Sequence, residues 1–246
     1  MTARILDGKE LAADMRAEMK LEVARLKQEH DLVPCLAVVL VGDNPASVSY
    51  VKGKQKACKE VGLNSRELKF DADLSEAELL RVVVELNGDD EIDGILVQLS
   101  LPEGIDEDRI LNAIDPDKDV DGLHPVNLGR LMRGEEGFLP CTPRGVQEIL
   151  VRSGIEVEGR HVVVVGRSTL VGRPLANILS KKGPGANATV TLTAMPATKK
   201  PKEIDGDGSG EGSRPGLLQQ TQHPGGVSGK PGEGGETKTE EKGLDS

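Results

Sequence analysis

An unbroken apolar run covers residues 35–41 and ends at a turn-forming stretch, Gly-Asp-Asn-Pro, over residues 42–45. A strand that is apolar at every position is typical of a parallel sheet, which helices cover on both faces. Residues 8–29 carry apolar side chains three or four positions apart, which predicts an amphipathic helix in front of this strand. A helix, a buried strand and a turn in this order indicate an α/β fold with parallel strands.

The same alternation continues to residue 193. The further elements that we predict are helices over residues 47–61 and from Ser75, strands over residues 65–70 and 94–98, a helix from Thr142 to about Ser153, a buried strand over residues 161–165, a glycine-bounded turn over residues 166–172, a helix over residues 174–181 and a strand over residues 189–193. Glu78 lies at a capping-box position relative to Ser75, and Thr142 is a candidate helix cap before Pro143. Residues 101–137, rich in Pro, Asp and Gly, are expected to be irregular.

Composition changes sharply after residue 194. Residues 195–246 contain 12 Gly and 5 Pro in 52 residues, with no aromatic side chain. So little apolar surface cannot offset the entropy lost on ordering the backbone, so we predict a disordered tail. The chain then divides into three parts, residues 1–140, 141–194 and 195–246.

Charge and cysteine content exclude several classes of protein. The net charge of −10 argues against a partner such as nucleic acid or an anionic membrane surface. No apolar run approaches the ~20 residues of a membrane span, and the charged amino terminus does not resemble a signal peptide, so we expect a cytoplasmic protein. The three cysteines, Cys35, Cys58 and Cys141, form no CxxC pair, and we expect them to be reduced packing residues rather than disulfide or metal-binding groups.

Tyr50 and Lys54 lie four residues apart on the helix that follows the first strand, at the end of the sheet where α/β proteins bind ligands. An aromatic ring can stack on a flat heterocycle, and a partly desolvated lysine can exchange protons near neutral pH. The alternative is a solvated basic helix face, since Lys52, Lys56 and Lys59 are close by in sequence.

Gln98 ends the third predicted strand, and an acidic loop with Asp121 follows in the irregular segment. A buried carboxylate at Asp121 could accept paired N–H groups from a pterin-like ring. A solvated turn is the alternative for this loop. Calcium binding is rejected because the loop lacks the glycine and the distal glutamate of an EF-hand.

Residues 166–172 form a glycine-bounded loop between a predicted strand and a predicted helix. Its backbone N–H groups and the helix amino terminus could receive a phosphate. The loop is not a full GxGxxG motif, and an ordinary tight turn is an equal alternative.

Five motifs now stand in a fixed order along the chain. They are Asp43-Asn-Pro-Ala-Ser47 with Tyr50 and Lys54, Gly94-Ile-Leu-Val-Gln-Leu99 with Leu101-Pro102, Lys118-Asp-Val-Asp-Gly122 with His124-Pro125, Cys141-Thr-Pro143, and Val165-Gly-Arg-Ser168 with Val171-Gly-Arg-Pro174. Over residues 1–194 the chain resembles the bifunctional methylenetetrahydrofolate dehydrogenase/cyclohydrolase family. The resemblance implies an α/β folate-binding catalytic domain in residues 1–140, a partial Rossmann-like NADP-binding domain in residues 141–194, and no metal.

The resemblance also implies an activity and a set of site residues. The activity is NADP-dependent oxidation of 5,10-methylenetetrahydrofolate, followed by hydrolysis of the methenyl product to 10-formyltetrahydrofolate, in a homodimer. The implied folate-site residues are Lys54 as the principal catalytic group, Tyr50 packing on the folate, Gln98 positioning Lys54, and Asp121 holding the pterin. The implied cofactor-binding residues are Gly166, Arg167, Ser168 and Gly172, with Arg167 near the adenosine 2′-phosphate.

The resemblance has one departure at the cofactor site and ends after residue 194. Ala194-Met195 stand where the family has His-Ser, which leaves the choice between NADP and NAD open. Because the periodic pattern stops there, we expect weak dehydrogenase activity in this chain. The alternative function is a non-catalytic folate-binding or dimer-forming remnant.

Overall fold

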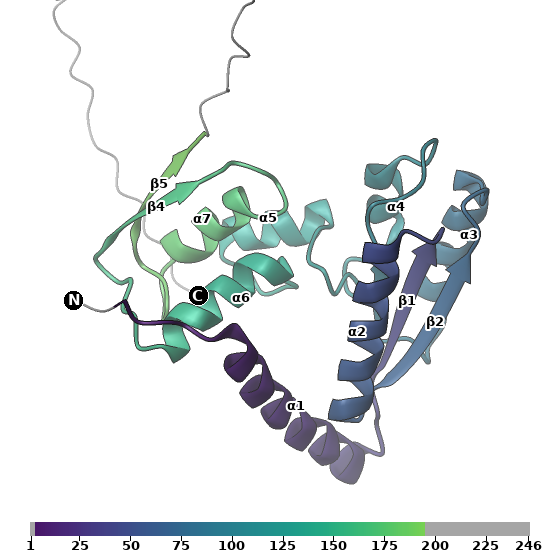
Figure 1. Ribbon diagram of the computed structural model, residues 1–246, viewed down its shortest axis with the longest axis horizontal. Helices are drawn as coiled ribbons and strands as arrows, with labels where there is room; N and C mark the ends of the chain where they lie inside the picture. The colour runs from purple at the N-terminus through teal and green to yellow at the C-terminus, as the bar shows by residue number, and fades with distance from the viewer. Residues whose placement is uncertain (1–2, 195–246) are drawn as a thin grey trace, which may run out of the picture. The chain divides into compact units, whose positions relative to one another are not determined.

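A computed structural model describes residues 3–194, and Figure 1 shows how its helices and strands are arranged. In chain order the elements are α1 (Gly8–His30), β1 (Cys35–Val41), α2 (Pro45–Val61), β2 (Asn64–Phe70), α3 (Glu76–Asn87), β3 (Gly94–Val97), α4 (Glu107–Ala113), α5 (Pro125–Arg133), α6 (Cys141–Arg152), β4 (His161–Val165), α7 (Gly172–Ser180) and β5 (Thr189–Thr193). The predicted α/β class with parallel strands is confirmed. The predicted disordered tail, residues 195–246, lies outside the described residues. The division of the chain near residue 140 stays a prediction.

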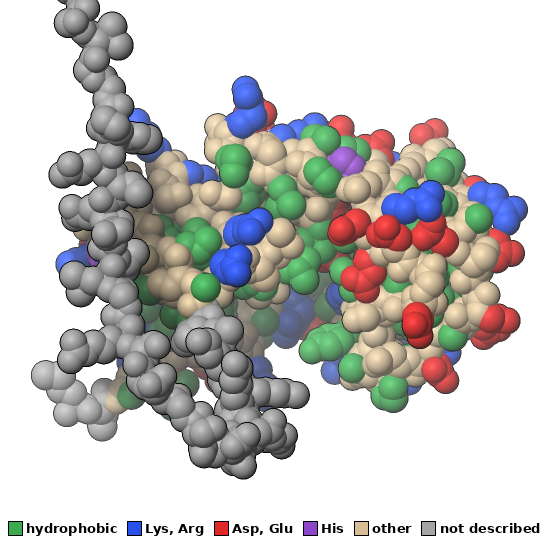
Figure 2. All heavy atoms as spheres, turned by 90° about the horizontal axis from the view of Figure 1, so that it is seen from above, with side chains coloured by type: hydrophobic (Ala, Val, Ile, Leu, Met, Phe, Trp, Pro, Cys, Tyr) green, Lys and Arg blue, Asp and Glu red, His purple; other side chains and the backbone are tan. Residues whose placement is uncertain are grey.

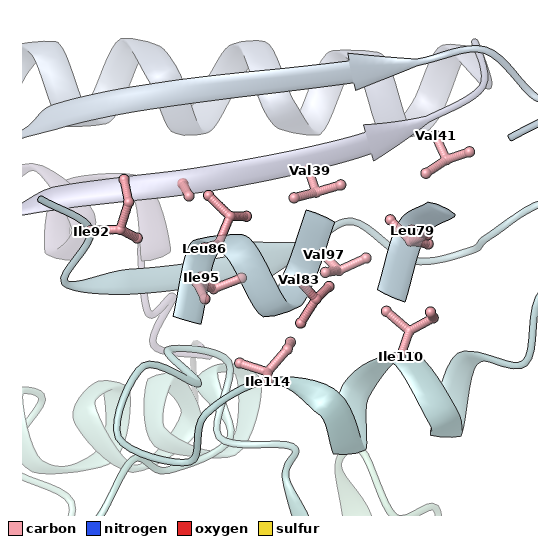
Figure 3. Packing of buried hydrophobic residues seen from close by; sticks show 11 residues of the cluster. Val39, Val41, Leu79, Val83, Leu86, Ile92, Ile95, Val97, Ile110 and Ile114 are labelled. Carbon is pink, nitrogen blue, oxygen red and sulfur yellow. The ribbon is translucent and has the colours of Figure 1, made fainter. Parts of the chain in front are cut away.

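The first sheet has the order β2-β1-β3, with all strands parallel and β1 in the centre. Side chains of β1 alternate between two cores, which explains why the whole strand is apolar. Ala37, Val39 and Val41 pack with α3 and α4 on one face, as Figure 3 shows for Val39 and Val41. Val38 and Leu40 pack against Val51 of α2 on the other face. The buried strand predicted over residues 35–41 is therefore confirmed.

Helix ends in this half follow the capping side chains. The side chain of Asn44 accepts hydrogen bonds from the backbone N–H groups of Ala46 and Ser47, so α2 begins at Pro45, two residues earlier than predicted. The capping box predicted from Ser75 and Glu78 is present at the start of α3. The Asn44 cap places the start of α2 directly after the carboxyl end of β1.

The segment predicted to be irregular, residues 101–137, contains two short helices, so that prediction was wrong. The side chain of Asp106 caps α4, and the ring Nδ1 of His124 caps α5, with Pro125 in its first turn. A composition rich in Pro, Asp and Gly concealed these caps because the same residue types also form turns.

The second sheet pairs β4 with β5 in parallel, joined through α7. Two predictions about this part were wrong. Thr142 does not cap α6, since the helix already begins at Cys141, and the N–H of Arg144 reaches the carbonyl of Pro140. Strand β4 is not buried: Val163 and Val165 are 53% and 67% exposed. Within residues 3–194, β4 pairs with β5 alone, and apolar sequence cannot reveal how many neighbours a strand has.

Acidic side chains gather over the part of the molecule that carries the first sheet, as Figure 2 shows. This acidic surface is in keeping with the net charge of −10. No helix in the described part of the chain combines the length and the apolar character needed to cross a membrane.

Candidate functional site

Lys54 and Gln98 meet at the carboxyl end of the first sheet. The Nζ atom of Lys54, which is half-buried on α2, donates a hydrogen bond to Oε1 of Gln98 at 3.1 Å. The Nε2 group of Gln98 donates to the carbonyl of Leu99 at 2.7 Å, which turns Oε1 toward the lysine. Gln98 lies one residue beyond β3, and its backbone N–H still donates to the carbonyl of Val39. The ammonium group of Lys54 is thus held by a side chain whose own orientation is set by the backbone.

Tyr50 lies one helical turn before Lys54, and 66% of its surface is exposed. An exposed ring beside the lysine is available to a planar ligand. The alternative of a wholly solvated basic face fits Lys52 and Lys56, which are exposed, but it does not fit Lys54.

Asp121 lies in the loop of residues 118–122, which we call the Asp121 loop. Burial raises the pKa of its carboxyl group above the ordinary value, although Lys54 and the thiol of Cys141 act in the opposite direction. The ammonium of Lys54 therefore lies close enough to interact with Asp121, and the structure brings Lys54, Gln98 and Asp121 together. A desolvated carboxylate beside a cation is suited to bind N–H groups of a ligand.

Two glycines allow the Asp121 loop to pack closely. A Cβ atom added to Gly94 would lie 2.4 Å from Cγ1 of Val120. At Gly122, where φ is +65°, an added Cβ would lie 2.4 Å from the backbone carbonyl carbon of Leu139 and 2.6 Å from the nitrogen of Pro140. The loop therefore contacts the segment just before α6, and only glycine permits this approach at residue 122.

Lys118 at the start of the Asp121 loop has a structural role. Its Nζ atom donates to the backbone carbonyls of Leu86, Asn87 and Asp89 at 3.4, 2.9 and 2.9 Å. These carbonyls lie at the carboxyl-terminal end of α3, which Lys118 joins to the loop.

A cavity of about 230 Å³ lies beside these groups. Gln98 and Asp121 contribute to its wall, and Leu170 and Val171 of the glycine-bounded loop also line it. Larger hollows lie by the start of α1, by the starts of β1 and β2, between β4 and the glycine-bounded loop, and between α4 and α5, but none of these four is lined by Lys54, Gln98 or Asp121. The cavity of about 230 Å³ is the better candidate because Gln98 and Asp121 of the first sheet's motifs and Leu170 and Val171 of the glycine-bounded loop line it together.

Cys141 also lines this cavity. Its exposure, and not this position, contradicts the expected packing role. The residue is exposed, but its Sγ atom donates to the carbonyl of Val120 at 3.4 Å. Burial of the thiol and the neighbouring Asp121 carboxylate raise the pKa of Cys141 to about 11, and the thiol is therefore neutral at physiological pH. Its place at the start of the Cys141-Thr-Pro143 motif was the available signal. Cys35 and Cys58 are also free thiols.

The glycine-bounded loop depends on contact between its two terminal glycines. Gly166 has a φ of +117°, and a Cβ added to Gly172 would lie 2.1 Å from the carbonyl oxygen of Gly166. The hydroxyl oxygen of Ser168 accepts hydrogen bonds from the N–H groups of Val171 and Gly172 at 3.1 and 3.4 Å. Ser168 thus closes the loop onto the amino terminus of α7.

Three further backbone N–H groups of this loop are available to a ligand, whereas that of Gly166 donates to the carbonyl of Thr193. In the described part of the chain, the N–H groups of Arg167, Ser168 and Thr169 donate no hydrogen bond, and the side chain of Arg167 is exposed. Available N–H groups beside a helix amino terminus are suited to bind a phosphate. Within residues 3–194, no group of three or more His, Cys, Asp or Glu side chains is arranged to hold a metal ion.

Replacing Gly172 with alanine should lower the free energy of unfolding by about 1–3 kcal/mol, because the new methyl group overlaps backbone that cannot rotate away. Gly145→Ala is the matched control, since a Cβ at this helical position meets no atom within 4 Å. Urea denaturation of both variants measures the effect. Equal stability of Gly172→Ala and the parent protein would show that the loop does not require the close contact.

Two family models match the chain. The catalytic domain of tetrahydrofolate dehydrogenase/cyclohydrolase matches residues 6–121, and the NAD(P)-binding domain of the same enzymes matches residues 140–206. The bifunctional protein FolD of Dehalococcoides mccartyi is 57% identical over 192 residues, which are 78% of this chain and 65% of that protein. The chain therefore spans about two thirds of the length of this relative. FolD of Oceanobacillus iheyensis is 49% identical over 202 residues, 82% of this chain and 69% of that relative.

The chain is also similar to solved structures of FolD enzymes. The bifunctional FolD enzyme of Campylobacter jejuni is 46% identical, with a TM-score of 0.74 over 79% of this chain and 68% of that protein. The FolD enzyme of Trypanosoma brucei, whose structure contains NADP and an inhibitor, is 35% identical, with a TM-score of 0.73 over 79% of this chain and 65% of that protein.

Proposed function

The chain belongs to the tetrahydrofolate dehydrogenase/cyclohydrolase family, and from this premise we propose that it acts on one-carbon derivatives of tetrahydrofolate. The proposed reactions are oxidation of 5,10-methylenetetrahydrofolate with NADP and hydrolysis of 5,10-methenyltetrahydrofolate to 10-formyltetrahydrofolate. The observation that carries the proposal is the meeting of Lys54, Gln98 and Asp121 beside one cavity.

Hydrolysis requires a group that handles a proton beside the reacting carbon. Water adds to the carbon that bridges two nitrogens, a proton leaves the added water, and one carbon–nitrogen bond then breaks. Lys54 is the proposed proton-transfer group because it is half-buried and its direction is restrained by Gln98. In this proposal, Asp121 accepts N–H groups of the pterin ring and Tyr50 packs on the folate.

The cofactor site is proposed at the glycine-bounded loop. When bound, NADP would accept a hydride from the one-carbon bridge, and the chemistry of that transfer belongs to the cofactor. The loop fits a phosphate-bearing ligand because the contact of Gly172 with Gly166 leaves no side chain over the available N–H groups. In this proposal Arg167 is the cation for the 2′-phosphate, and Ser168 keeps the loop closed. A homodimer in the cytoplasm is also proposed, and gel filtration with light scattering tests the dimer.

The decisive experiment assays the two reactions separately. Purified protein is given methenyltetrahydrofolate alone, and in a second assay methylenetetrahydrofolate with NADP, while folate binding is measured by calorimetry. We expect hydrolysis that Asp121→Asn weakens mainly through KM, because the substituted amide presents an N–H group to the pterin. Folate binding without either reaction would favour the non-catalytic alternative, and absence of binding would overturn the proposal.

A further inference from the structure

Asp119 is a buried carboxylate behind the candidate site, with only 1% of its surface exposed. One oxygen, Oδ2, accepts hydrogen bonds from the backbone N–H of His124 at 2.8 Å and from Nδ2 of Asn127 at 3.0 Å. Both donors belong to the start of α5. A charged group removed from water needs such partners, and here they hold Asp119 to the helix.

Asn127 is also buried, and it joins α5 to both ends of the preceding turn. Its Nδ2 group donates to the carbonyl of Pro116 at 2.8 Å as well as to Asp119, and its Oδ1 atom accepts from Nη1 of Arg130 at 3.2 Å. All the polar atoms of this amide are therefore in use. An amide with every partner satisfied allows little freedom of position.

The backbone of Asp119 is restrained from the opposite side by β3. Asp119 forms an isolated parallel bridge with Ile95, and the N–H of Ile95 donates to the carbonyl of Lys118 at 2.7 Å. Three residues after Asp119, Gly122 contacts the backbone of Leu139 and Pro140. Asp121 is the one carboxylate between these fixed points, and it faces Cys141 and the cavity.

We propose that Asp119 and Asn127 form a positioning pair that holds Asp121 beside Cys141 and thereby sets the affinity of the site for the pterin ring, without contacting the ligand. Asp119 and Asn127 do not line the cavity. The part of this inference that concerns folate rests on the proposed function. The part that concerns the position of Asp121 does not.

The first test uses Cys141 as a reporter and needs no folate. Groups facing this thiol are Asp121 and Asp119 from the loop and Lys54 from α2. The protein is alkylated with iodoacetamide at several pH values between 7 and 11, and mass spectrometry of the Cys141 peptide measures the rate of alkylation. The rate of alkylation follows the fraction of thiolate, so its pH midpoint reports the pKa of Cys141. Because Asp121 contributes to raising this pKa, displacement of Asp121 should lower the midpoint by about one unit. Alkylation at pH 8 should then be about tenfold faster.

Variants of Asn127 separate position from charge. Asn127→Ser keeps the charge of Asp119 but removes the amide that holds it, so a lower midpoint in this variant reports displacement of Asp121. Asn127→Ala, which also keeps the charge of Asp119, serves as the second reading should Asn127→Ser fail to fold. Asp119→Leu removes both the charge and the acceptor oxygen. Because the charge of Asp119 itself raises the pKa of Cys141, Asp119→Leu is used only in the hydrolysis assay. Asp117→Asn is the matched control, because Asp117 belongs to the same turn, pairs with Arg130 and has a side chain that is 78% exposed. A midpoint in Asn127→Ser, or in Asn127→Ala in its place, equal to that of the parent protein would overturn the proposal.

The second test measures hydrolysis of methenyltetrahydrofolate. Asn127→Ser and Asp119→Leu should each raise KM by about tenfold and change kcat by less than about threefold, whereas Asp117→Asn should change neither. The double variant should cost less than the sum of the two single effects, because both changes break the same hydrogen bond. If the parent protein shows no turnover, the proposed function fails, and the alkylation midpoints still decide whether the positioning pair exists. An unchanged KM with a lowered midpoint would overturn the claim about affinity.

Discussion

Lys54→Met should lower kcat for methenyl hydrolysis at least about 100-fold, the range in which a proton-transferring side chain contributes. Methionine keeps much of the volume of the lysine stem but removes the ammonium group that donates to Gln98. Affinity for the folate should stay within about tenfold, because Asp121 and Tyr50 remain in place. Hydrolysis is followed by the loss of methenyl absorbance, and affinity is measured by calorimetry.

The matched control for this prediction is Lys56→Met. Lys56 lies two residues further along α2 and is exposed, so its loss should leave hydrolysis within about twofold of the parent rate. Adding Gln98→Leu to Lys54→Met should cause little further loss, since Gln98 acts through the lysine that is already absent. Normal hydrolysis by Lys54→Met would remove Lys54 from the catalytic role.

Gly122→Ala should lower the free energy of unfolding by about 2–5 kcal/mol. About 1–2 kcal/mol comes from the left-handed backbone conformation, and about 1–3 kcal/mol from overlap of the methyl group with the backbone of Leu139 and Pro140. Since the loop must move to relieve this overlap, Asp121 should also leave its place beside Cys141. Urea denaturation measures the stability, and the KM for methenyltetrahydrofolate reports the site.

Gly134→Ala separates the two contributions. Gly134 has a φ of +74°, close to the +65° of Gly122, but a Cβ there meets no atom within 4 Å. This control should therefore show the conformational cost alone, about 1–2 kcal/mol, with KM unchanged. Equal losses of stability in Gly122→Ala and Gly134→Ala would show that the contact with Leu139 and Pro140 is not tight in solution.

Much of the fold could be predicted because local signals agree with the final packing. Strand β1 is apolar at every residue, and the structure places a core on each of its faces. The capping box at Ser75 was visible because its two residues are three positions apart. Helices α4 and α5 were missed because 7 and 9 residues are too few for a clear period, although the caps Asp106 and His124 were present.

The candidate site was less predictable than the strands. Spacing alone placed Tyr50 and Lys54 one turn apart, but the pairing of Lys54 with Gln98 came from the family resemblance, since 44 residues separate them. The positioning pair has no local signature, and the Cys141-Thr-Pro143 motif does not reveal that the thiol lies beside Asp121. Both depend on how α5 and α6 pack against the Asp121 loop, which periodicity does not reveal.

The triple hydrogen bonding of Lys118 limits how the site can respond to a ligand. Its ammonium group joins the Asp121 loop to the last turn of α3, and Val83 and Leu86 of that helix are buried in the first core. The backbone of the loop therefore cannot swing open as an independent lid, because such a motion would break these bonds or disturb the packing of α3. Adaptation to ligands of different shape is left to rotation of the exposed Tyr50 side chain. The site should therefore select ligands that fit its existing shape rather than reshape itself around them.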